Sequence, residues 1–271
     1  MHSYPIYFFS DAHLGATTLG DDRDRETQLI RFLEYAAANQ GEIYIVGDLF
    51  EFWFEYREVI PNRNFRVLAT FYHLTRQGCK IHYLPGNHDL WIGSFLRQEL
   101  GLVIHGGATE VKTQAYNIFV IHGDGMARSD RGYRFLKKIF THPVNIFLYR
   151  WIHPDLGIPF AKKMSHVSRA QGEQKKDPFE QEYRIFVQEK FSQGYDIVIM
   201  GHTHKPVHEI YGSRHYINLG DWIDHFSYCE LDENGPVVRQ WPSQRVYVEP
   251  IQKQSTETVS ESRMVASHRL D

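Results

Sequence analysis

The sequence has little cysteine and no long apolar segment. Its 271 residues include only Cys79 and Cys229, too few and too isolated for a disulfide framework or a thiolate metal site. The longest apolar stretches, such as VNIFLYRWI, fall far short of the roughly 20 residues that a membrane-spanning helix needs. The opening residues MHSYPIYFF have no basic stretch before a long apolar run, unlike a secretory signal. We therefore expect a cytoplasmic protein, with a peripheral membrane contact left open.

The chain also lacks a large excess of either charge, because its formal net charge is −3. The charges are nevertheless distributed unevenly. Residues 128–176 carry eleven Lys and Arg against three acidic residues, a balance of +8 that leaves −11 to the remainder. A basic segment attracts phosphate-bearing partners, whereas an acidic pocket is suited to divalent metal ions.

Short β-branched and aromatic runs predict buried strands at residues 6–9, 43–46, 81–84, 117–121 and 196–200. Helical patterns at 26–40 and 64–78 end at glycines suited to C-caps, so the chain begins in βαβα order. Later strands around 103–112, 206–212 and 215–220 come closer together and indicate a second sheet. We expect an α/β protein in which a sandwich of two sheets is flanked by helices.

The periodicity becomes helical from about residue 128 to residue 190, where Pro143, Pro154 and Pro159 divide it. This segment predicts a helical cap inserted in a domain that spans residues 1–250. Residues 251–271 are polar and without periodicity, which predicts a flexible tail.

Metal-ligand residue types follow each of the five predicted strands. The motifs are SDAHLG, GDLFEFW, GNHD, HGDG and GHTH. Taken singly, such residues are ordinary turn formers or structural histidines. Because α/β sheets place their sites in the loops at strand ends, the recurrence at five strands favours one shared site.

Phosphate ester hydrolysis explains why such a site needs these residue types. The anionic oxygens of the ester repel a nucleophile, and two divalent cations about 3.5 to 4 Å apart neutralise them and lower the pKa of water. Carboxylate, amide oxygen and imidazole suit Mn, Fe or Zn, whereas the lack of nearby thiolates argues against a structural zinc site.

The five motifs resemble the ordered set DxH, GD, GNH[DE], H and GHxH of the calcineurin-like metallophosphoesterases, over about residues 6–222. That resemblance implies a four-layer α/β/β/α sandwich and two divalent metal ions, with Mn²⁺ favoured over Fe or Zn. It assigns Asp11, His13 and His204 to one metal ion. It assigns Asn87, His122 and His202 to the other, with Asp48 as the bridge. It also implies that His88 assists at the phosphate or the leaving oxygen, while Asp89 orients its imidazole.

Within this superfamily the sequence is most similar to the UDP-2,3-diacylglucosamine pyrophosphatases of lipid A synthesis. The similarity lies in SDAHLG, GDLFEFWF, the HGD motif followed by Asp130, the helical cap, and LGDW ending at Trp222. It implies cleavage of UDP-2,3-diacylglucosamine to UMP and 2,3-diacylglucosamine 1-phosphate at the cytoplasmic face of an inner membrane. It implies substrate contacts from Asn87, His88, Asp130, Ser165 and Arg169. The chain departs from the enterobacterial members, which have Arg where His88 stands.

Other functions are less well matched. A protein phosphatase would carry DRG after the bridging aspartate, and DNA-repair nucleases have longer chains with further DNA-capping segments. A soluble dinuclear phosphodiesterase or nucleotide pyrophosphatase with another substrate stays open. A non-catalytic binding protein is disfavoured, because all the expected ligands are present.

The cap segment has two further interpretations. Its aromatic runs IFLYRWI and IPF alternate with basic residues such as Arg134 and Arg150, a composition suited to acyl chains and anionic headgroups. Alternatively, these helices pack their apolar faces on the core and expose a solvated basic face. Single-stranded nucleic acid also binds basic and aromatic surfaces, but no recognised nucleic-acid motif orders the aromatic residues here. We therefore expect a nucleotide-linked glycolipid substrate, and no nucleic-acid partner.

Overall fold

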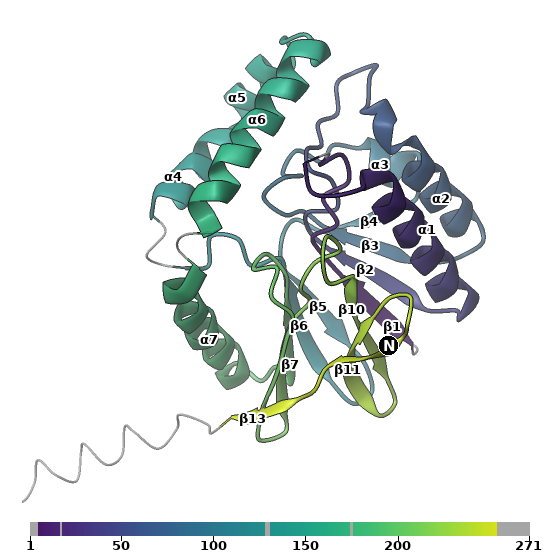
Figure 1. The fold of residues 1–271 in the computed structure, drawn as a ribbon, viewed down its shortest axis with the longest axis vertical. Coiled ribbons are helices and arrows are strands. Elements are labelled where there is room, and N and C mark those ends of the chain that lie inside the picture. The colour runs from purple at the N-terminus through teal and green to yellow at the C-terminus, as the bar shows by residue number, and fades with distance from the viewer. Residues whose placement is uncertain (1–4, 17, 128–130, 174–175, 254–271) are drawn as a thin grey trace, which may run out of the picture.

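The computed structural model describes residues 5–16, 18–127, 131–173 and 176–253, with the backbone alone at 131, 164–173 and 176–179. Two sheets form its centre (Figure 1). The first has the strand order β12-β11-β10-β1-β2-β3-β4, and the second has the order β13-β8-β9-β7-β6-β5. Strands and helices alternate through the first part of the chain: β1 (Ile6–Phe9), α1 (Asp22–Ala38), β2 (Glu42–Val46), η1 (Asn62–Asn64), α2 (Phe65–Arg76), β3 (Ile81–Leu84), α3 (Phe95–Gln98) and β4 (Val103–Ile104).

Strands β1 to β4 are parallel neighbours, so their carboxyl ends lie at one edge of the first sheet. The strands predicted at 6–9, 43–46 and 81–84 and the two predicted helices are confirmed. Helix α1 starts four residues earlier than predicted, because the side chain of Asp21 accepts hydrogen bonds from the backbone of Arg23 and Asp24 and caps the helix there.

The second sheet contains β5 (Thr109–Lys112), β6 (Asn117–Ile121), β7 (Ile197–Met200), β8 (Val207–Tyr211), β9 (Arg214–Asn218) and β13 (Ile251–Lys253). Strands β6, β7 and β9 are parallel, so they too share one carboxyl edge. The segment 103–112, predicted to belong to the second sheet, divides between the two sheets. Its first residues form β4 of the first sheet and its last form β5 of the second, with Gly106 and Gly107 between them.

Three apolar layers hold the molecule together. The middle layer joins the two sheets through residues such as Phe8, Val46 and Ile199. Another packs the first sheet against α1 and α2, around Phe9 and Phe32. A third packs α7 (Lys176–Ser192) on the second sheet through Val187, Phe191, Val198 and Met200. The result is the expected four-layer α/β/β/α sandwich.

The predicted helical insertion divides into two structural parts. Helices α4 (Arg131–Phe140), α5 (Pro143–Tyr149) and α6 (Pro154–Glu173) stand away from the sheets in Figure 1. Helix α7 instead covers the second sheet and is the fourth layer. The cap therefore consists of α4 to α6, and the prediction that it extends to about residue 190 is wrong. Among the described residues, no helix combines the length and the apolar character needed to cross a membrane.

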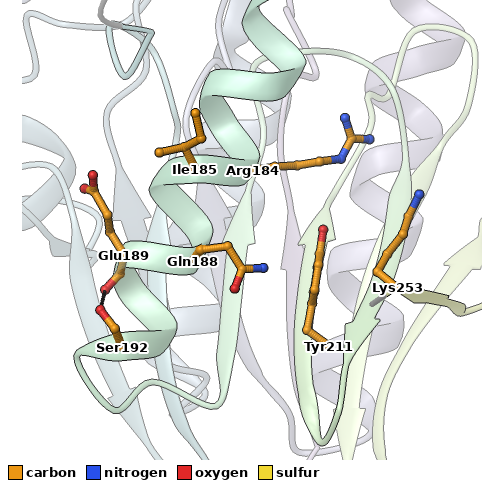
Figure 2. A pocket seen from close by; sticks show the side chains of 7 residues that line it. All are labelled: Arg184, Ile185, Gln188, Glu189, Ser192, Tyr211 and Lys253. Atoms are coloured by element: carbon orange, nitrogen blue, oxygen red, sulfur yellow. Dashed lines mark hydrogen bonds between the residues drawn. The ribbon is translucent and has the colours of Figure 1, made fainter. Parts of the chain in front are cut away.

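A charged contact fixes α7 to the second sheet. The guanidinium of Arg184 donates to both carboxylate oxygens of Glu209 on β8, at 2.9 and 3.2 Å, and the Tyr211 hydroxyl donates to Glu209 at 2.7 Å. Burial alone would raise the pKa of Glu209, but these two partners bring it below its ordinary value. Figure 2 shows the groove beside this contact, with Arg184, Tyr211 and Lys253 turned toward one another between α7 and β13.

The last strands were not predicted from the sequence. They are β10 (Ser227–Asp232), β11 (Gly235–Gln240) and β12 (Arg245–Val248), and β10 pairs antiparallel with β1. The tail was predicted to begin at residue 251, which is too early, because Ile251–Lys253 form β13 and pair with β8. The rest of that predicted tail, 254–271, lies outside the described residues. Backbone pairing with neighbouring strands decides these strands, and a local side-chain pattern carries little information about it.

Candidate metal centre

The five motifs meet where the carboxyl edges of the two sheets adjoin. Asp11 and His13 follow β1, Asp48 follows β2, and Asn87 follows β3 in the first sheet. The second sheet contributes the remaining residues, with His122 following β6, and His202 and His204 following β7. The structure thus brings together all seven residues that the sequence predicted as metal ligands.

The backbone is strained at this position. Among the described non-glycine residues, positive φ angles occur at few places, and five of them are predicted ligands: Asp11 (55°), His13 (46°), Asp48 (51°), His202 (70°) and His204 (58°). Such angles cost on the order of 1 kcal/mol or more each for residues with a Cβ. These positive φ angles occur in the loops after β1, β2 and β7, where the backbone turns the ligand side chains toward one point.

The glycines in front of Asp48, Asn87 and His202 are required by close packing. A Cβ at Gly86 would lie 2.1 Å from Asp48 Oδ1, and one at Gly47 would lie 2.4 Å from His122 Nδ1. At Gly201 the nearest atom would be Ser10 Oγ, at 2.5 Å. The motifs GD, GNH and GHTH therefore need glycine because another motif's side chain or its neighbour occupies the space.

Asp11, His13 and His204 form the first group. His204 Nε2 lies 3.2 Å from Asp11 Oδ1 and also 3.2 Å from His13 Nε2. The other ring nitrogen of His13, Nδ1, lies 3.1 Å from Glu51 Oε2. Because an ionised carboxylate only accepts hydrogen bonds, Nδ1 carries the hydrogen, and Nε2 of the neutral ring presents a lone pair to the group.

Asp48, Asn87, His122 and His202 form the second group. His122 Nδ1 donates to the carbonyl oxygen of Val46 at 2.8 Å, which turns Nε2 toward Asp48 Oδ2 at 3.4 Å and Asn87 Oδ1 at 3.3 Å. The ring of His202 completes this group. Asp48 Oδ2 is also 3.8 Å from His13 Nε2, so this carboxylate lies between the two groups.

The buried carboxylates in the two groups need positive charge nearby. Burial disfavours the ionised form of both aspartates, yet the surrounding histidines hold the pKa of Asp11 and of Asp48 far below the ordinary value. Burial lowers the pKa of His122, but Asp48 and Asp11 raise it well above its usual range. Two buried carboxylates thus require compensating cations, supplied by protons on the imidazoles or by metal ions.

The donor set fits divalent metal ions. Asp11 Oδ1 is buried and accepts no well-formed hydrogen bond from the described residues. Carboxylate, amide and imidazole donors converge in both groups, and no cysteine lies among the members. Glu51 on Nδ1 of His13 and the Val46 carbonyl on Nδ1 of His122 orient the rings in the way that metal-binding histidines require.

One predicted pairing is wrong. Asp89 does not orient His88: its carboxylate accepts hydrogen bonds from the backbone of Gly86 at 2.6 Å and Leu49 at 2.9 Å, and from the Tyr83 hydroxyl at 2.5 Å. Burial and the nearby Asp48 raise the pKa of Asp89 to about 6. His88 Nδ1 instead donates to the carbonyl oxygen of Glu51 at 3.2 Å. Asp89 therefore ties the loops after β2 and β3 together beneath the site.

Sequence reasoning missed two acidic residues that contact the predicted ligands. Glu51 stands in the GDLFEFW motif, of which only Asp48 was assigned a role, and its buried carboxylate accepts from His13. Asp221 stands in the LGDW motif, and its Oδ2 lies 3.9 Å from His204 Nδ1. The signal available in both cases was an acidic residue within a motif already singled out.

The three substrate contacts predicted in the cap cannot be placed. Asp130 lies outside the described residues. Ser165 and Arg169 belong to α6, which is described there by its backbone alone. Their predicted contacts with substrate therefore stay predictions.

A cavity of about 590 Å³ extends from the metal centre into the cap. Asn87 and His88 line one part of it, together with Glu51. The remaining lining is mainly apolar and comes largely from α4, α5 and α6, including Leu136, Ile139, Phe140, Leu148, Ile152 and Phe160. The indole of Trp91 lines the same cavity and donates to the carbonyl oxygen of Phe140 at 2.8 Å, which joins the cap to the loop after β3.

The family model and the curated relatives identify the family of this chain. The model of the calcineurin-like phosphoesterase family matches residues 4–206. A UDP-2,3-diacylglucosamine hydrolase of Porphyromonas gingivalis is 34% identical over 245 residues, covering 84% of this chain and 94% of that protein. Another of the same name, from Tolumonas auensis, is 27% identical and covers 83% and 92%. Among solved structures, Yfce, a phosphoesterase from E. coli, aligns with a TM-score of 0.47 at 16% identity, covering 90% and 96%. The chain therefore belongs to the calcineurin-like phosphoesterase family of metal-dependent hydrolases.

Proposed function

We propose that this protein hydrolyses UDP-2,3-diacylglucosamine to UMP and 2,3-diacylglucosamine 1-phosphate. The observation that carries the proposal is the apolar cavity that opens from Asn87 and His88 into the cap. A phosphoesterase for small soluble esters has no use for such a cavity, whereas a substrate with two acyl chains needs one next to its pyrophosphate. The relatives from P. gingivalis and T. auensis, both named UDP-2,3-diacylglucosamine hydrolase, support the same substrate.

The seven grouped side chains have a clear role in this reaction. Asp11, His13 and His204 would hold one divalent ion, Asn87, His122 and His202 would hold the second, and Asp48 would contact both. When bound, the ions supply charge neutralisation for the phosphate and lower the pKa of a water molecule. We propose Mn²⁺, because the mixed oxygen and imidazole set suits it.

We propose that His88 acts on the phosphate itself. Its Nδ1 donates to the carbonyl of Glu51, which fixes the ring, and its Nε2 lies 3.9 Å from Asp48 Oδ2. The same residue lines the cavity. In the reaction the water oxygen bonds to one phosphorus as the bond from that phosphorus to the bridging oxygen breaks. A protonated His88 would stabilise the charge that develops on the phosphate oxygens or on the departing bridge oxygen.

The outer face of the cap supports a position at a membrane surface. Trp151 is 75% exposed, Leu156 69% and Phe147 53%, so large apolar side chains of α5, α6 and the turn between them face solvent. Exposed apolar groups beside basic residues are typical of proteins that lie on anionic membranes. Because the proposed substrate is a lipid, we propose peripheral attachment to the cytoplasmic face of the inner membrane.

The decisive experiment measures UMP release from UDP-2,3-diacylglucosamine with added Mn²⁺ in detergent, beside UDP-glucose and bis(p-nitrophenyl) phosphate. The proposal predicts a strong preference for the acylated substrate. Equal or greater turnover of the two simple substrates would reject it and leave a soluble phosphodiesterase or nucleotide pyrophosphatase.

A pair of variants links the preference to the cavity. Leu148 lines the cavity, whereas Val144, one turn earlier on α5, does not line it. The two side chains are similarly exposed, at 57% and 54%, so the pair differs mainly in its position relative to the cavity. Leu148→Glu places a carboxylate among the acyl chains, so we expect the preference over UDP-glucose to fall about tenfold or more. Val144→Glu makes the same change of charge outside the cavity and is expected to keep the preference.

A further inference from the structure

Two lysines of the cap reach the metal centre from different helices. Lys137 of α4 pairs with Asp124, which stands two residues after His122. Lys162 of α6 donates to the carbonyl oxygen of Gly15 at 3.0 Å, and Gly15 stands two residues after His13. Each ammonium therefore contacts a loop that carries predicted metal ligands, one loop from each sheet.

The two lysines differ in how their charge is compensated. Lys137 faces the carboxylate of Asp124, a buried residue that also accepts from the Tyr133 hydroxyl at 2.6 Å. Lys162 faces an uncharged carbonyl. We therefore regard Lys137 as a tether that holds α4 on the core, whereas the charge of Lys162 is left for another partner.

A second cation lies beside Lys162. A Cβ on Gly15 would be 3.2 Å from Lys162 Nζ and 3.9 Å from Arg63 Cδ, so both side chains flank this glycine. Arg63 pairs with Asp22 at 3.0 Å, but the same carboxylate also pairs with Arg25 at 2.8 Å. One carboxylate thus serves two guanidinium groups, which leaves positive charge in excess next to the loop after β1.

The pKa of Lys162 reflects this surrounding. Burial lowers it, the guanidinium of Arg63 lowers it further, and the carboxylates of Glu51 and Asp22 only partly oppose them. Glu51 is itself engaged with His13 Nδ1. An anion bound beside Lys162 would stabilise the protonated amine in place of these partners.

We propose that Lys162 and Arg63 form an anion subsite that binds the phosphoryl group of the substrate that the metal ions do not hold. This inference rests on the proposed function, because it requires a pyrophosphate attached to acyl chains. Phe160 and Ala161, which directly precede Lys162, line the apolar cavity, so acyl chains seated there bring the sugar phosphate toward this part of α6. Gly15 has no side chain to obstruct the space in front of the two cations.

The test compares a pyrophosphate with a simple diester in matched lysine variants. Lys162→Met is measured beside Lys162→Arg, which keeps the charge, and Lys163→Met, which removes a charge from the neighbouring exposed position. Lys137→Met shows how the kinetics change when a contact that only holds α4 on the core is lost. For each Mn²⁺-loaded variant, kcat and KM are determined with UDP-2,3-diacylglucosamine, and kcat/KM with bis(p-nitrophenyl) phosphate, after thermal unfolding has shown that it is folded.

We expect Lys162→Met to raise KM for the pyrophosphate about 10- to 100-fold, the range for a lost hydrogen bond to a charged group, and to affect the diester far less. Lys162→Arg should recover most of the loss, and Lys163→Met should resemble wild type. Arg63→Gln should show a smaller loss of the same kind, and it keeps the inference testable if Lys162→Met does not fold.

Two outcomes would overturn the subsite. Equal losses on both substrates, as expected for Lys137→Met, would make Lys162 a second tether that acts through the Gly15 loop. An unchanged KM for the pyrophosphate in both Lys162→Met and Arg63→Gln would show that neither residue binds phosphate. Failure of the proposed function is separate, since it appears as wild-type protein that does not turn over UDP-2,3-diacylglucosamine.

Discussion

Glu51 illustrates how a single buried carboxylate prepares a metal ligand. It holds the hydrogen of His13 on Nδ1 and leaves Nε2 for the metal group, while its backbone carbonyl fixes the ring of His88. The same residue therefore positions one predicted ligand and the predicted catalytic histidine. Losing the carboxylate frees the His13 ring to rotate and to change tautomer.

We predict that Glu51→Ala lowers the affinity for metal about 10- to 100-fold, the usual effect of removing such an orienting partner. Metal content after dialysis against graded Mn²⁺, determined by mass spectrometry, checks this. Glu58→Ala is the control, because Glu58 lies in the same loop but is exposed. Wild-type metal affinity in Glu51→Ala would contradict the role assigned to this carboxylate.

Gly86 allows a second test at the scale of one residue. A methyl group there would lie 2.1 Å from Asp48 Oδ1, so the carboxylate between the two metal groups must move. Gly86→Ala is expected to reduce kcat by about 100-fold or more, since misplacing a catalytic group by about 1 Å has effects of this size.

Gly106→Ala is the matched control, because a Cβ at Gly106 would meet nothing within 4 Å. Initial rates with bis(p-nitrophenyl) phosphate are compared for the two variants. Near-wild-type activity in Gly86→Ala would mean that the position of Asp48 is less constrained than its packing indicates.

At the scale of elements, the hairpin of β8 and β9 pairs the buried His208 with the partly buried His215. His208 Nε2 lies 3.0 Å from His215 Nδ1. Burial, followed by the charge of His215, lowers the pKa of His208 to about 4. In the unfolded chain His208 titrates near its ordinary value, so between about pH 6.5 and 4 the unfolded state binds more protons. Stability conferred by the neutral pair is therefore present above this window and decreases as the pH falls through it.

We predict that metal-free wild-type protein loses about 2 kcal/mol of unfolding free energy between pH 7 and pH 4.5 through His208. Urea denaturation at the two pH values measures the loss. His208→Leu removes the titrating group, so its decrease over the same range should be smaller by that amount. Parallel pH dependence in the two proteins would show that His208 does not retain its lowered pKa.

Elements also differ in how far local sequence predicts them. Strands β1, β2 and β3 were predicted because their side chains are buried throughout and almost all apolar, which leaves a nearly continuous signal. Strands β10, β11 and β12 were not, because charged residues, glycine and proline interrupt β10 and β11 and most of β12 is exposed, so none shows a continuous apolar run. Helix α7 was assigned to the cap because its helical period does not say which surface its apolar side covers.

At the scale of the whole molecule, the predicted metal ions would join the two sheets. The ligands of one ion follow β1 and β7, those of the other follow β3, β6 and β7, and Asp48 after β2 would contact both, so each ion would cross-link loops of both sheets. We therefore predict that removing metal with a chelator abolishes turnover and lowers the melting temperature.

At free Mn²⁺ about a hundredfold above Kd, the expected stabilisation of roughly 3 kcal/mol corresponds to about 5 to 10 °C in a chain of this size. Scanning fluorimetry with and without Mn²⁺ measures the shift. Activity that survives exhaustive chelation, or a melting temperature that does not respond to Mn²⁺, would argue against a bound metal centre.

The exposed apolar face of the cap leads to a prediction about membranes. The double variant Trp151→Ser, Leu156→Ser removes two large exposed side chains. We expect its partition to vesicles of phosphatidylethanolamine and phosphatidylglycerol to fall at least about tenfold, because burying each side chain contributes on the order of 1.5 to 3 kcal/mol. Co-sedimentation measures the bound fraction, and a doubly substituted protein that sediments like wild type would exclude this face as the contact.

The sequence by itself determined the chemistry of the candidate site: which motifs of Asp, Asn and His supply it, their order, and their position after buried strands, while the resemblance to a family assigned the individual ligands. Those features are local, because a ligand type that follows an apolar run can be read without knowing the fold. Only the tertiary structure decided that Glu51 and not Asp89 holds His88, that α7 is a layer and not part of the cap, and that a cavity joins the cap to the metal centre. These depend on contacts between residues far apart in the chain, such as Lys162 with Gly15, and local periodicity does not encode such contacts.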